Sequence, residues 1–118
     1  MQPTDNRTLL MSYTIFHIGT YISFAAAIIA AQKLGLVLTG YVMRSSLALL
    51  VIASICGAIV ASHLPDSESW DQYREMRIGP FGLPLLTYRW WAKAEHLCAW
   101  AAFLVPLSLA VFCPQALK

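Results

Sequence analysis

The sequence predicts an all-α, polytopic integral membrane protein with three transmembrane helices in one membrane domain covering residues 1–118. Hydrophobic residues make up 58% of the chain and charged residues 12%, whereas soluble domains carry about 25% charged residues. The mean hydropathy is +0.61. A water-soluble chain of this size could not bury so much apolar surface, because small domains keep much of their surface wet. The expected solvent is therefore a bilayer.

Three apolar stretches are long enough to cross the hydrocarbon layer, which takes about 20 helical residues. The spans are expected at about residues 11–31, 43–63 and 91–112. Helices are expected because a backbone in lipid must satisfy its own hydrogen bonds. The first stretch exceeds the ~7–15 apolar residues of a signal peptide, so we interpret it as a span that the protein retains.

The connection at residues 64–90 is expected to form an interfacial loop or short helix between the second and third spans. Its first half predicts a short surface helix with Asp66 or Ser67 as the capping residue. Its second half, residues 78–86, contains two prolines and two glycines, which disfavour a helix. We expect that the backbone of this half does not pair with itself, and that its apolar side chains contact the membrane interface or a partner.

Lysine and arginine residues predict the orientation. Three spans put the N-terminus and the connection at 64–90 on one side, which carries five of these cations against three on the other. The positive-inside rule then places the N-terminus and the long connection in the cytoplasm. The expected location of the chain is a bacterial inner membrane.

The third span begins with a mixture of aromatic and basic side chains, which is typical of a membrane interface. The predicted interface anchors are Arg89, Trp90, Trp91 and Lys93. Glu95 lies about one turn deeper, where a charge costs about 2.5–3.5 kcal/mol on insertion scales. We expect its partner on another helix or on the long connection.

All three histidines are predicted to lie within roughly 10 Å of one membrane level, at 1.5 Å per helical residue. Neutral imidazoles bind haem iron, copper or zinc, and histidine can also hydrogen-bond a quinone or relay protons. The candidate cofactors are therefore haem b or a quinone, with His17, His63 and His96 as the binding residues. The structural alternative is that these are interfacial histidines, and no HExxH or HxH spacing indicates a metal site.

Small residues recur every four positions on the spans, which allows helix backbones to approach closely. The predicted helix-packing residues are Gly19, Ser23, Gly57 and Ala61. A polar stripe on the first span is expected to face protein, a cofactor or a narrow wet crevice rather than lipid. The buried polar residues are predicted to be Tyr13, Thr20 and Glu95, with His17 on the same stripe.

The predicted function is that of a small, non-enzymatic subunit of an energy-transducing membrane complex, respiratory or photosynthetic, with a structural or assembly role in electron transport. Its expected partners are other membrane subunits, lipid and, if the histidines are used, a quinone. A redox subunit that binds haem b or quinone is the first alternative, and a small homo-oligomeric transporter is the second. The net charge of +2 and the scattered basic residues argue against a nucleic-acid partner.

Overall fold

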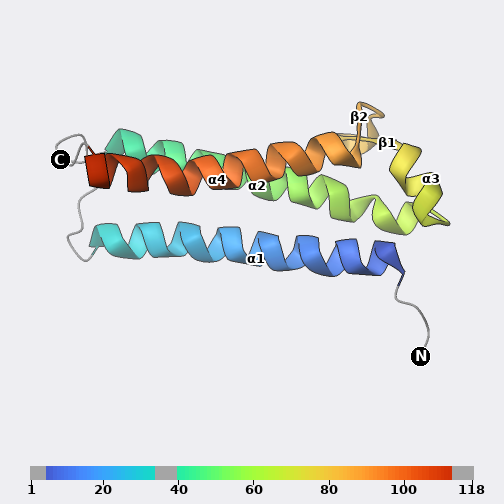
Figure 1. Cartoon of the computed structure of the whole chain (residues 1–118), viewed down its shortest axis with the longest axis horizontal. Coiled ribbons are helices and arrows are strands. Elements are labelled where there is room, and N and C mark those ends of the chain that lie inside the picture. Colours follow the sequence, from blue (N-terminus) through green and yellow to red (C-terminus); the bar gives the residue numbers. More distant parts are fainter. Residues whose placement is uncertain (1–4, 34–39, 113–118) are drawn as a thin grey trace.

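The computed structural model describes residues 5–33 and 40–112, and it is mostly helical, which agrees with the predicted all-α class. Three long helices lie alongside one another and run the length of the molecule (Figure 1). Short elements connect the second long helix to the third. The elements in chain order are α1 (Asn6–Lys33), α2 (Gly40–Ser62), η1 (Leu64–Asp66), α3 (Trp70–Glu75), β1 (Arg77–Ile78), η2 (Pro80–Gly82), β2 (Leu86–Thr87) and α4 (Tyr88–Phe112).

Two helices are long and apolar enough to cross a membrane. These stretches are Asn6–Ala30, with a mean hydropathy of 1.5, and Gly40–Asp66, with a mean hydropathy of 2.3. The described residues of α4 do not include a third such stretch. The third span therefore stays a prediction.

The exposure of α1 distinguishes it from the core helix of a soluble protein. Only 11% of its most apolar stretch is buried. Large apolar side chains on its outer surface are bare, including Phe16 at 71% exposure and Ile22 at 62%. Such a surface is stable in lipid or against another protein, and unfavourable in water.

The central helix of the bundle is α2, which packs against both α1 and α4. The buried core at mid-bundle contains Tyr21 of α1, Leu50 and Ala53 of α2, and Ala102 of α4. The backbone of α1 lies close to that of α2, while α1 contacts α4 mainly through long side chains that are described below.

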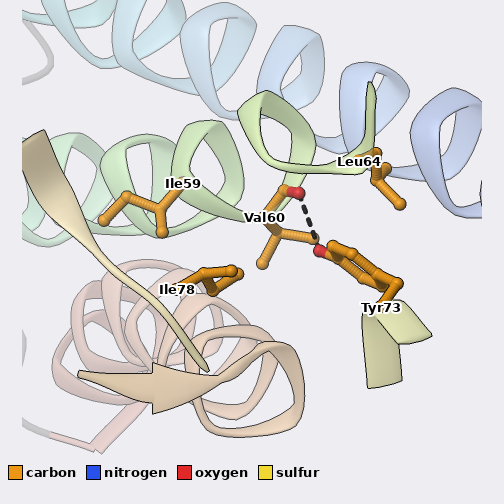
Figure 2. Close-up of a cluster of buried hydrophobic side chains, with 5 residues drawn as sticks. All are labelled: Ile59, Val60, Leu64, Tyr73 and Ile78. Atoms are coloured by element: carbon orange, nitrogen blue, oxygen red, sulfur yellow. Dashed lines mark hydrogen bonds between the residues drawn. The ribbon is translucent and has the colours of Figure 1, made fainter. Parts of the chain in front are cut away.

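Residues 64–87 form a packed structure, here called the cap, over one end of the bundle. Figure 2 shows its apolar centre, in which Tyr73 of α3 and Ile78 of β1 pack against the end of α2. Tyr73 is completely buried, and its hydroxyl group donates a 2.7 Å hydrogen bond to the carbonyl oxygen of Val60. The cap is therefore held to α2 by a buried side chain as well as by chain connectivity.

Two expectations about this connection were wrong. Residues 78–86 do pair with themselves, because β1 and β2 form an antiparallel hairpin in which Ile78 is opposite Leu86. Pro80 and Pro84 lie in the turn between the strands, where no ladder hydrogen bond needs their missing N–H groups. The residue that caps the N-terminus of helix α3 is Ser69, not Asp66 or Ser67. Its side chain accepts a 3.2 Å hydrogen bond from the backbone N–H of Gln72.

Candidate functional site

A polar stripe on α1 faces α4. The hydroxyl group of Tyr13 lies 3.0 Å from Nε2 of His96, and the ring centroids of His17 and His96 are 5.7 Å apart. Tyr13 and His17 are one turn apart on the same helix, and their ring centroids are separated by 3.9 Å. Two of the three predicted histidines are therefore neighbours, with a tyrosine between their helices.

Backbone carbonyl groups fix the protonated nitrogen of both imidazoles. Nδ1 of His17 lies 2.8 Å from the carbonyl oxygen of Tyr13, and Nδ1 of His96 lies 2.7 Å from that of Ala92. A carbonyl oxygen can only accept, so each Nδ1 must donate, and a neutral ring then carries its lone pair on Nε2. His96 uses that lone pair to accept from Tyr13. Nε2 of His17 has no hydrogen-bond partner among the described residues.

A largely apolar crevice lies beside this pair, between α1 and α4. It consists of two hollows of about 340 Å³ and 370 Å³, which share the side chains of Phe24 and Phe103. The first hollow has polar groups from Tyr13, His17 and His96. A cleft of a few hundred Å³ with few, convergent polar groups is the usual form of a small-molecule site.

Glu95 is buried where the three helices meet. Its side chain is only 2% exposed, and the hydroxyl group of Tyr21 donates a 2.9 Å hydrogen bond to its Oε1. Gly57 of α2 leaves space for this carboxyl group, because a Cβ atom there would lie 3.3 Å from Oε1 and 3.2 Å from Cγ1 of Ile18. The partner of Glu95 is thus on another helix, and it is a neutral hydroxyl group rather than a cation.

Tyr21 is the site residue that sequence reasoning missed. It continues the four-residue spacing of Tyr13 and His17 by one more turn, and that spacing was the signal that could have found it. Thr20, which was assigned to the polar stripe, is half-buried, and its hydroxyl group donates to the carbonyl oxygen of Phe16 on its own helix.

His63 makes no ring contact or hydrogen bond with His17 or His96 among the described residues, so the structure brings together two of the three predicted histidines. Nδ1 of His63 lies 2.9 Å from the carbonyl oxygen of Ile59, one turn back on α2. The ring therefore bonds to its own helix end beside the cap. The described part of the chain contains no group of three or more histidine, cysteine or acidic side chains that could hold a metal ion.

The four predicted interface anchors behave in two ways. Arg89 and Trp90 are exposed, and Nζ of Lys93 lies 5.0 Å from the Trp90 ring centroid, which is cation–π geometry. Trp91 is half-buried instead, and its Nε1 donates a 2.8 Å hydrogen bond to the carbonyl oxygen of Ile78. Trp91 therefore fastens the hairpin of the cap to α4.

The small residues also divide into two groups. Gly57 is buried inside the bundle and Ala61 is half-buried. Gly19 and Ser23 are exposed on α1, and a Cβ atom on Gly19 would meet nothing within 4 Å. Their face of α1 is therefore uncovered by the described part of this chain.

The comparisons with protein-family models, curated proteins and solved structures find no match to this chain.

Proposed function

We propose that the chain is a small three-span subunit of a larger energy-transducing membrane complex in a bacterial inner membrane, with the cap on the cytoplasmic side. The observation that carries the proposal is the uncovered outer face of α1. That face combines small and branched apolar residues at helical spacing, namely Ile15, Gly19, Ile22, Ser23 and Ala26, all of which are exposed. Small residues of this kind form the grooves into which a neighbouring transmembrane helix packs.

Two further features support the three-span topology. The run from Leu97 to Phe112 of α4 is mostly apolar and packs along α2, which is itself long and apolar enough to cross a membrane. The guanidinium group of Arg7, at the start of α1, donates to the carbonyl oxygen of Ser67 in the cap. This contact is consistent with the start of α1 and the cap lying on one side of the membrane.

The test is the composition of the particle that contains this chain after extraction in mild detergent. We expect a fixed stoichiometry with other integral membrane proteins, and we expect Gly19→Leu to release them by filling the groove. Ser108→Leu is the matched control, because Ser108 is also small and exposed but lies on α4. A chain that is a lone monomer in both detergent and native nanodiscs, with no crosslinked neighbour, would contradict the proposal.

A second candidate function is a redox subunit that binds haem b, and the tautomer of His17 favours it. A haem iron binds the lone pair of a neutral imidazole, and ligating histidines usually donate their other N–H to a carbonyl or carboxylate group. His17 has this arrangement beside the apolar crevice. A quinone carbonyl needs a donor instead, and in the tautomer that donates from Nδ1 to Tyr13 the Nε2 atom of His17 is an acceptor, so this contact favours haem over quinone.

If haem were bound, it would supply one-electron transfer, and the chain would supply the imidazole of His17 as a ligand and an apolar crevice. His96 could ligate as well only if the hydroxyl group of Tyr13 left its Nε2. We expect a reduced-minus-oxidised spectrum of the purified particle to show a b-type band that His17→Ala removes and His63→Ala retains. A spectrum without that band, or a band that survives His17→Ala, would reject this candidate.

A further inference from the structure

Three arginine side chains line one hollow on the surface of the cap. Arg74 comes from the last turn of α3, Arg77 from β1 and Arg89 from the first turn of α4. The hollow has a volume of about 430 Å³, and Glu75 and Thr87 complete its lining. Three guanidinium groups and one carboxylate give this small region a net charge of +2.

The arginines are not neutralised by the rest of the described chain. All three side chains are exposed, and none has a carboxylate oxygen within 4.0 Å among the described residues. The ion pair that the described residues do form joins Arg7 to Asp5. Like charges held together without a counterion repel one another, so the hollow favours an anion. Guanidinium groups present paired N–H donors that match the oxygens of a phosphate group.

An exposed apolar turn adjoins the hollow. Arg77 and Thr87 form one cross-strand pair of the β1–β2 hairpin, and the turn of that hairpin carries Phe81. Phe81 is fully exposed, with a positive φ of 57° that directs the chain around the turn, and it is followed by Leu83 at 52% exposure and Leu85 at 48%. Segments that rest on an anionic membrane surface combine an exposed apolar tip with a neighbouring group of positively charged side chains.

The position of the hairpin fits that surface. In Figure 1 the hairpin projects to the side of the bundle, beyond α4 and near the end that carries α3. If the long helices cross a bilayer, a sideways projection at the helix ends lies over the leaflet instead of pointing into the water. Trp90, 58% exposed on the first turn of α4, is at the level expected for an interfacial aromatic side chain.

We propose that Arg74, Arg77 and Arg89 bind the phosphate headgroup of an anionic phospholipid, while the hairpin tip enters the boundary between headgroups and acyl chains. The apolar tip points to a lipid rather than a soluble phosphate compound, because a soluble ligand would leave Phe81 and the leucines in water. The inference rests on the proposed membrane insertion, but it does not depend on membership of a larger complex.

The test uses the full chain in nanodiscs that contain phosphatidylcholine and phosphatidylglycerol, followed by native mass spectrometry of the lipids that stay bound in detergent. We expect about a tenfold preference for phosphatidylglycerol, because the positive hollow attracts a lipid with a net negative charge more strongly than a zwitterionic one. Combined Arg74→Gln, Arg77→Gln and Arg89→Gln should abolish the preference. Lys33→Gln with Arg44→Gln, which removes cations at the opposite helix ends, should retain it.

A second arm separates a lipid from a soluble phosphate compound. Phe81→Ser with Leu85→Ser should weaken the retention of phosphatidylglycerol. If the hollow were instead a site for a soluble phosphate compound, inorganic phosphate would displace the bound lipid, and these two substitutions would leave its retention unchanged. Equal retention of both lipids by the native chain would overturn the inference. Protease protection measured on the same samples reports insertion: an inserted chain without lipid preference refutes the lipid site alone, and a chain that does not insert refutes the membrane proposal as well.

Discussion

The hydroxyl group of Tyr21 on α1 donates a 2.9 Å hydrogen bond to Oε1 of Glu95 on α4, at a point where both side chains are buried. The backbone of α1 packs mainly on α2, and this bond joins α1 to α4 together with the contact between Tyr13 and His96. It satisfies a carboxyl group that would otherwise be isolated in an apolar interior, where an unpaired polar group is costly.

Removing the donor should destabilise the bundle more than altering the acceptor. Tyr21→Phe leaves the carboxyl group of Glu95 without its partner, and we expect the free energy of unfolding to fall by about 1–2 kcal/mol. Glu95→Gln keeps an oxygen acceptor and should cost less. The measurement is reversible unfolding in mixed micelles.

A double-mutant cycle of Tyr21→Phe with Glu95→Leu should give a coupling energy of about 0.6–1.7 kcal/mol, and a coupling of zero would show that the bond is not formed.

The two glycines of the helix-packing set should respond differently to the same substitution. A Cβ atom on Gly57 would lie 3.2 Å from Cγ1 of Ile18, closer than ordinary packing, whereas one on Gly19 would meet nothing within 4 Å. We expect Gly57→Leu to separate α1 from α2 and to lower the unfolding free energy by roughly 1–3 kcal/mol, as overpacking does. Gly19→Leu should leave the stability of the isolated chain unchanged. Thermal unfolding in detergent distinguishes the two, and equal losses would contradict the packing described here.

The positions of the long helices could be predicted from hydropathy, but their ends could not. The first span was expected from residue 11, while α1 begins at Asn6, because a helix continues through polar residues such as Asn6 and Thr8 beyond the apolar stretch. The packed cap was beyond prediction for another reason. It depends on contacts between residues far apart in sequence, such as Tyr73 with Val60 and Trp91 with Ile78, which no local pattern encodes.

The positions of the three histidines show that the depth of a residue in the membrane can be predicted from sequence, whereas the direction of its side chain cannot. Counting residues along each span gives the depth of a side chain, but its direction depends on the rotation of the helix about its own axis. His17 and His96 face one another across α1 and α4, whereas His63 bonds back to α2. The effect of Pro80 and Pro84 on strand pairing could not be predicted either, because it depends on whether they lie in a strand or in the turn between two strands.

The orientation can be tested with single cysteines in a background that lacks Cys56, Cys98 and Cys113. A cysteine at Ser69, in the cap, should react with a membrane-impermeant reagent only from the cytoplasmic face, and one at Lys33, at the far end of α1, only from the periplasmic face. Both native residues are exposed, so the reagent can reach a cysteine at either position. Ser69→Cys also removes the capping hydrogen bond of α3 to Gln72, which lies outside the three long helices. The opposite pattern would invert the orientation. Labelling of both from one face would mean that the chain does not cross the membrane an odd number of times between them.

The stability of the cap should depend on pH through Tyr73. Burial, and then the neighbouring Tyr88, raise the pKa of the Tyr73 phenol well above its ordinary value of about 10. Below pH 10 the phenol is neutral whether the cap is closed or open, so its contribution is fully present. Above pH 10 the open state ionises first, and the free energy of opening should fall by at most about 1.4 kcal/mol per pH unit.

The measurement is hydrogen exchange of residues 64–87 between pH 9 and pH 11, corrected for the intrinsic exchange rate. Tyr73→Phe should cost about 1 kcal/mol at pH 8, because the buried carbonyl group of Val60 loses its donor, and it should remove the added loss above pH 10. Tyr41→Phe is the control, since Tyr41 is 82% exposed at the other end of α2, and its pH profile should match that of the native chain. If the profile of Tyr73→Phe also fell as steeply as the native one, another group would have to open the cap, and the bond between Tyr73 and Val60 would not be what holds it closed.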